Sequence, residues 1–170
     1  MTKLVIEILI IVLLLAANGV FAMTEIAVVS ARKARLRRLA ATGDARARAA
    51  LELAESPNRF LATVQVGITL VGVLAGAFGG ATIAEEIAGA LQSVPLLAAY
   101  GEAIGIGVVV LGITFCSLIL GELVPKRIGL NNPERIARFM AGPMNRLAWL
   151  ASPLVDLLTA STELVVRIIR

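Results

Sequence analysis

The hydrophobic pattern of the chain is dominated by three long apolar runs that polar stretches separate. The runs cover about residues 4–29, 60–80 and 103–124, and each is long enough to cross about 30 Å of hydrocarbon. A hydrophobic content of 58% and a mean hydropathy of +0.89 are too high for a water-soluble chain of 170 residues. The pattern therefore predicts an all-α integral membrane protein with three transmembrane helices.

Basic residues are confined to particular stretches of the chain, and this predicts an orientation. Residues 31–57 are Arg-rich and broken at Thr42-Gly43-Asp44, which predicts two basic helices on the cytoplasmic side, whereas no Lys or Arg lies between Phe60 and Pro125. The acidic connection 81–102 is then outside. We expect a multi-pass plasma membrane protein with its N-terminus outside and its C-terminus in the cytoplasm. With so little soluble surface, the Arg face fits anionic lipid better than nucleic acid.

The last part of the chain, residues 133–170, predicts an amphipathic belt. Asn132 and Pro133 form a good helix start, and Glu134 is expected to lie exposed in the first turn. Residues 147–169 are apolar enough for a fourth span, but polar residues recur on one helical face, which favours a helix lying on the membrane. Pro153 should bend this helix. Both placements of 147–169 stay open.

The third apolar run ends at an acid. Glu122 would cost several kcal/mol in hydrocarbon unless it is paired or hydrated, so it predicts a functional site. Pro125 has no N–H, and the carbonyl of Gly121 should therefore lose its helical partner beside the Glu122 carboxylate. Such a pair of hard oxygens is typical of Mg²⁺, Ca²⁺ or Na⁺ sites. Alternatively, Glu122 only ends the helix and reaches water.

Polar groups on the other two runs are expected at a similar depth. Asn18 and Glu25 are seven residues apart and share a helix face, and Thr63 and Thr69 lie in the first half of the second run. Convergence of polar groups from three helices favours a site between them, although Asn18 could instead only hydrogen-bond a neighbouring helix. Gly72, Gly76 and Gly80 form a small-residue ridge suited to packing or dimerisation.

The residue types also exclude several classes of function. There is no His, and Cys116 is the only Cys, so histidine-dependent catalysis and thiolate metal sites are not available. No serine-centred motif suggests an enzyme, and we expect none. A non-transporting membrane scaffold or Mg²⁺ sensor stays the alternative to a transporter.

Three segments in order carry a family resemblance: NGVFAMTEIAVVSARKARL, SPNRFLATVQVGITLVGVLAG and GELVPKRIGLNNPERIA. Together they resemble the transmembrane domain of the CorC and cyclin-M (CNNM) magnesium transporters. The resemblance implies a homodimer in membrane lipid, a juxtamembrane belt, and export of a bound Mg²⁺, coupled to Na⁺ entry. Members continue into paired cytosolic CBS modules that bind ATP. This chain stops before them and is expected to be the single transmembrane domain.

The residues and the resemblance together indicate one magnesium site near the inner leaflet. One departure from the cyclin-M pattern is Ala22, which stands where that branch has Ser, so that ligand would come from the backbone or from Thr24. Mg²⁺ takes six oxygens and keeps part of its water shell. The expected oxygens are the Glu122 carboxylate, the carbonyls of Gly121 and Gly67, the hydroxyls of Thr24, Thr63 or Thr69, and the side chains of Glu25 and Asn18.

The orientation can be tested by single-cysteine labelling on a Cys116→Ser background. A cysteine introduced by Glu85→Cys should react with an impermeant thiol reagent from outside the cell, and one introduced by Arg46→Cys only after the membrane is opened. The opposite labelling pattern would reverse the predicted topology.

Overall fold

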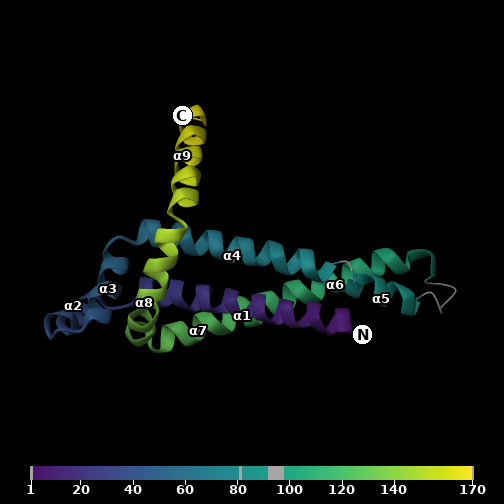
Figure 1. The fold of residues 1–170 in the computed structure, drawn as a ribbon, viewed down its shortest axis with the longest axis horizontal. Coiled ribbons are helices and arrows are strands. Elements are labelled where there is room, and N and C mark those ends of the chain that lie inside the picture. The colour runs from purple at the N-terminus through teal and green to yellow at the C-terminus, as the bar shows by residue number, and fades with distance from the viewer. Residues whose placement is uncertain (1, 81, 92–97, 170) are drawn as a thin grey trace. The chain divides into compact units, whose positions relative to one another are not determined.

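The structure is a computed structural model that describes residues 2–80, 82–91 and 98–169 (Figure 1). Every regular element in these residues is a helix, which confirms the all-α prediction. Contacts divide the chain into two units. The first, here called the span unit, comprises Met1–Val20 and Ile68–Pro125, and the second, the juxtamembrane unit, comprises Phe21–Gly67 and Lys126–Arg170.

Three helical segments are long and apolar enough to cross a membrane. They are α1 (Thr2–Ser30), α4 with α5 (Pro57–Gly80 and Thr82–Leu91), and the continuous run of α6, η2 and α7 (Gly101–Leu118, Ile119–Leu123 and Val124–Asn131). The chain is therefore a multi-pass membrane protein, with three candidate transmembrane segments in the described residues and a fourth candidate in its C-terminal part. In the connection 81–102, the structure places α5 and a 3₁₀ turn, η1 (Ala98–Tyr100).

The C-terminal part is a bent pair of helices, α8 (Pro133–Leu150) and α9 (Ser152–Ile169). They meet at 67° around Ala151, two residues before Pro153. The bend is expected, because proline at the second position of α9 cannot continue a preceding helix. Together the two helices also satisfy the length and composition needed for a fourth crossing. The placement of residues 147–169 on or across the membrane stays a prediction.

The close helix contacts of the span unit occur at glycines other than the predicted ridge. A Cβ atom at Gly105 of α6 would lie 2.6 Å from the carbonyl oxygen of Ala84, and one at Gly101 would lie 3.3 Å from that of Ala88. These distances show that α5 packs backbone-to-backbone on α6. Only glycine leaves room for such an approach.

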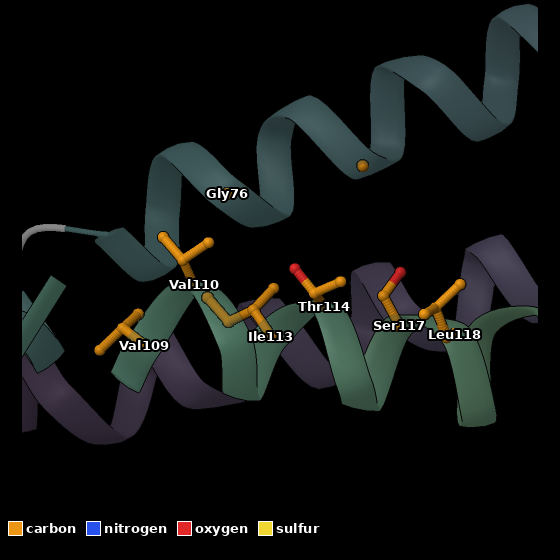
Figure 2. Close-up of a pocket in the computed structure, with 8 residues that line it drawn as sticks. Gly76, Val109, Val110, Ile113, Thr114, Ser117 and Leu118 are labelled. Carbon is orange, nitrogen blue, oxygen red and sulfur yellow. The ribbon is translucent and has the colours of Figure 1, made fainter. Parts of the chain in front are cut away.

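The glycine ridge of α4 lies beside a cavity instead. A Cβ atom at Gly72 or Gly76 would meet nothing within 4 Å, so the expectation of tight packing within one chain is wrong at these two positions. Figure 2 shows Gly76 across from α6, with the hydroxyl oxygens of Thr114 and Ser117 turned toward α4. The cavity has a volume of about 260 Å³. The surroundings of Gly80 lie outside the described residues, and dimerisation through the ridge stays a prediction.

The juxtamembrane unit has a small core between α2 (Lys33–Ala41), α3 (Ala45–Glu55) and α8. The buried side chains are mostly alanines, which let the helices approach closely; they are Leu36, Ala47, Ala50, Leu53, Ala54, Ala137, Met140, Ala141 and Met144. Gly43, with φ of 93°, makes the turn between α2 and α3. In this core α3 packs on both α2 and α8.

Asp44 fixes the start of α3 and ties it to α8. Its Oδ1 accepts hydrogen bonds from the backbone N–H groups of Arg46 (2.9 Å) and Ala47 (3.0 Å), and its Oδ2 forms an ion pair with Arg138. The Ala47 N–H, and then the Arg138 charge, lower the pKa of Asp44 below its ordinary value. A capping carboxylate of this kind stabilises the first turn of a helix.

Glu134 differs from its expected exposed position. Only 9% of its surface is accessible, and its carboxylate lies 3.6 Å from the guanidinium of Arg35 on α2. The ion pair comes from a neighbouring helix, which the sequence context of a helix start does not reveal. Glu134 therefore links the first turn of α8 to α2, and the expectation that it lies exposed is wrong.

The α5–α6 contact generates a paired prediction on one helix. Gly105→Ala should destabilise the protein, because its Cβ would collide with the Ala84 carbonyl. Gly107→Ala introduces the same group where nothing lies within 4 Å, and it should be neutral or stabilise by up to about 1 kcal/mol through helix propensity. The measurement is the thermal midpoint of each variant in detergent. Equal midpoints would contradict the close contact.

Candidate cation-binding site

The third transmembrane segment changes its helical form at the predicted acid. Residues Ile119–Leu123 form a π-helical turn, in which the N–H of Val124 donates to the carbonyl of Ile119, five residues earlier. Glu122 lies in this turn and is half-buried. Single π-turns inside α-helices are rare and occur frequently at functional sites.

Pro125 explains why the turn is irregular. It has no N–H, so it gives no hydrogen bond to Gly121 in an α pattern or to Leu120 in a π pattern. Both carbonyls lie against α1: a Cβ atom at Gly19 would be 3.2 Å from the Leu120 oxygen and 2.9 Å from the Pro125 ring. Gly19 thus allows α1 to pack directly on the turn.

Asn18 of α1 holds one of these carbonyls. Its Nδ2 donates a hydrogen bond of 3.1 Å to the Gly121 oxygen, and Asn18 is only 6% exposed. Proline is expected to release the Gly121 carbonyl from its helical hydrogen bond. In agreement, this carbonyl accepts its hydrogen bond from a side chain of another helix. The alternative interpretation of Asn18, a hydrogen bond to a neighbouring helix, is also what the structure shows.

The other end of the Asn18 amide remains available. Its Oδ1 is buried and accepts no hydrogen bond from the residues that the structure describes. A buried acceptor without a donor costs about 1–3 kcal/mol, and a bound cation would remove that cost. Amide, carbonyl and carboxylate oxygens are the hard ligands that Mg²⁺, Ca²⁺ and Na⁺ take. We call Asn18, Leu120, Gly121 and Glu122 the proline-turn cluster.

The remaining predicted residue of the span unit, Thr69, is exposed in this chain. The other four predicted residues belong to the juxtamembrane unit. There Thr24 is fully buried, and Thr63 is buried with its hydroxyl donating to the Arg59 carbonyl at 2.9 Å. Glu25 is half-buried. Gly67 lies under the Phe21 ring, which a Cβ atom would approach to 2.9 Å. The structure therefore brings Asn18 and Gly121 together beside Glu122, and the roles of the other residues stay predictions.

The composition of the cluster limits what it can bind. Among the described residues, no three Asp, Glu, Cys or His side chains gather closely enough to form a metal site on their own. A site here would combine one carboxylate with neutral oxygens. Mg²⁺ is commonly held by one or two carboxylates and several waters, so this donor set suits it.

Sequence reasoning did not identify Leu120 or Gly19. The signal for both was present, because a proline inside an apolar run releases the carbonyls four and five residues before it. A glycine next to Asn18 on the facing helix is what that released backbone needs for close contact. The π-turn itself has no sequence signature beyond Pro125.

Comparison with known proteins gives a family and named relatives. The model of the cyclin M transmembrane N-terminal domain matches residues 9–170. The UPF0053 protein sll0260 of Synechocystis is 51% identical over 162 residues, which cover 95% of this chain and 36% of that protein. The polyamine export protein of Haemophilus influenzae is 32% identical over 148 residues, covering 87% and 34%. That of Escherichia coli K12 is 30% identical over 164 residues, covering 96% and 36%. The chain spans about a third of the length of these curated relatives.

The Asn18 contact generates a prediction about stability. Asn18→Ala should lower the free energy of unfolding by about 1 kcal/mol or more, because the buried Gly121 carbonyl loses its donor. Thr69→Ala removes an exposed hydroxyl and should stay within about 0.5 kcal/mol of the parent. Unfolding in detergent measures both variants. Equal losses would show that the Asn18 hydrogen bond does not stabilise the turn.

Proposed function

The chain belongs to the cyclin M transmembrane N-terminal domain family, and from this premise we propose that it transports Mg²⁺ across the membrane. The observation that carries the proposal is the proline-turn cluster. There the Asn18 amide donates a hydrogen bond to the Gly121 carbonyl, next to Glu122, and its own buried Oδ1 accepts no hydrogen bond from the described residues. Export is the proposed direction, with Na⁺ entry as the coupled movement. Both follow from the resemblance of the three quoted segments.

The chemistry of the cluster supports a small divalent cation. Mg²⁺ dehydrates reluctantly, so a site for it replaces only part of the water shell and supplies charge through one or two carboxylates. Glu122 supplies that charge. Neutral oxygens from Asn18, Gly121 and Leu120 can replace individual waters without binding the ion so tightly that it cannot leave.

A second candidate substrate is a polyamine, because two of the relatives above are named polyamine export proteins. Ammonium groups would use the same acceptors as Mg²⁺, namely the Glu122 carboxylate and the Asn18 amide oxygen. A polyamine is long, however, and needs several acceptors spaced along its length. The compact proline-turn cluster satisfies one ammonium and fits Mg²⁺ better.

The direct experiment is flux in proteoliposomes, measured for Mg²⁺ and for spermidine, each with and without a Na⁺ gradient. The proposal expects Mg²⁺ flux that the Na⁺ gradient accelerates. Spermidine flux without Mg²⁺ flux would establish the second candidate instead. Absence of both fluxes with a Mg²⁺-dependent rise in the melting temperature would identify a Mg²⁺ sensor, and absence of the fluxes and of the rise would identify a scaffold.

Glu122→Gln tests the charge in the cluster. The amide keeps the shape and one carbonyl oxygen but removes the negative charge, so Mg²⁺ affinity should fall at least about tenfold, or about 1.4 kcal/mol. The protein should still fold, since a neutral amide is easier to keep within the membrane than a carboxylate. Isothermal titration of the purified protein with Mg²⁺ gives the affinity.

The matched control is Glu102→Gln. Glu102 is an exposed acid in the first turn of α6, at the other end of the same transmembrane segment. It should bind Mg²⁺ as the parent does. If both variants keep the parent affinity, Glu122 only ends the helix and the magnesium proposal fails.

A further inference from the structure

A cavity also lies in the juxtamembrane unit, and none of its lining residues belongs to the proline-turn cluster. It has a volume of about 350 Å³ and lies where α3 ends, α4 begins and α8 passes both. This size lies in the range of small-molecule sites. The cavity lining includes Glu52, Ser56, Arg59, Phe60, Asn145 and Trp149.

Three of these residues favour a position of the cavity at the edge of the membrane. Arg59 and Phe60 lie in the first turn of α4, which is the start of the second transmembrane segment. Trp149, near the end of α8, is 79% exposed. Tryptophan is enriched at the boundary between hydrocarbon and head groups, because its ring is apolar and its N–H is polar. An exposed tryptophan beside a span start is therefore expected to contact lipid.

The cavity is lined by an acidic and a basic side chain, one before and one after the short junction between α3 and α4. Glu52 lies in the last turns of α3, whose C-terminal end carries a partial negative charge, and Arg59 lies at the start of α4, whose N-terminal end carries a partial positive charge. The charge of the side chain therefore has the same sign as the partial charge of the helix end, negative at Glu52 and positive at Arg59. The lining therefore offers one partner for a cation and one for an anion.

The nearest ion pair does not occupy Arg59 fully. Its guanidinium lies 3.8 Å from the Asp156 carboxylate, and the two side chains are 59% and 70% exposed. An exposed pair at this distance contributes little. Arg59 retains further N–H donors for a phosphate, which it can bind in a fork geometry. Asn145 adds an amide to the same wall.

We propose that this cavity binds the head group of phosphatidylethanolamine. The phosphate lies at Arg59 and the first turn of α4, the ammonium lies at Glu52, and the glycerol and first acyl carbons pass Phe60 and Trp149. A purely anionic head group would bring its charge close to Glu52. A choline group would fill the space but could not donate a hydrogen bond to the Glu52 carboxylate.

The binding experiment uses the whole chain, purified and stripped of lipid in detergent. Phosphatidylethanolamine, phosphatidylcholine and phosphatidylglycerol with identical acyl chains are titrated and counted by native mass spectrometry. Phosphatidylethanolamine should bind about tenfold more tightly than the other two, because only it makes charge-assisted hydrogen bonds at both ends. Equal binding of phosphatidylglycerol would overturn the proposal.

Two variants separate the two ends of the head group. Arg59→Gln should weaken all three lipids about tenfold through loss of the phosphate partner. Glu52→Gln should leave phosphatidylcholine unchanged and remove the preference for phosphatidylethanolamine. Glu52 is an exposed residue of α3, so its variant tests the proposal even if Arg59→Gln does not fold.

Arg48→Gln is the matched control, because Arg48 is an exposed arginine of α3 that does not line the cavity. It should bind all three lipids as the parent does. If Arg48→Gln and Arg59→Gln lose the same affinity, the effect is general surface charge and the proposal fails. Glycerophosphoethanolamine, which has no acyl chains, should not displace the lipid at equal concentration. Displacement would identify a water-soluble ligand instead. Neither result depends on Mg²⁺ transport.

Discussion

The span unit depends on one constraint, which is that a buried backbone carbonyl in a membrane must find a donor. Pro125 removes the helical donor, and Asn18 supplies another from α1 at 3.1 Å. The demand for a donor places a polar side chain in an otherwise apolar helix, and Gly19 beside it lets the two backbones approach. The same amide then presents its oxygen within the protein. The donor that satisfies the Gly121 carbonyl and the proposed ion ligand are therefore the two ends of one side chain.

Much of the fold could be predicted from the sequence, because the bilayer leaves few choices. Apolar length alone located the three segments that now contain α1, α4 and α6. The turn at Gly43 and the helix start at Pro133 also lie where glycine and proline favour them. These features depend on residues that are close in the sequence, so no tertiary information was needed.

Features that depend on a neighbouring helix were harder to predict. Glu134 has the sequence context of an exposed first turn, but it is buried and Arg35 of α2 pairs with it. The glycines of α4 have the spacing of a packing ridge, whereas the tight contact occurs at Gly105. For the candidate site, sequence reasoning identified Gly121, Glu122 and Asn18 but not the hydrogen bond that joins two of them. Spacing along one helix does not reveal which face another helix meets.

The π-turn also has a consequence for helical register. A π-turn contains one residue more than an α-helical turn, so every residue after it is rotated by about 100° around the helix axis. Side chains before and after the turn therefore no longer share a face at the ordinary 3.6-residue spacing. The irregular turn near Glu122 thus also decides which residues of this transmembrane segment line up along one side of the helix.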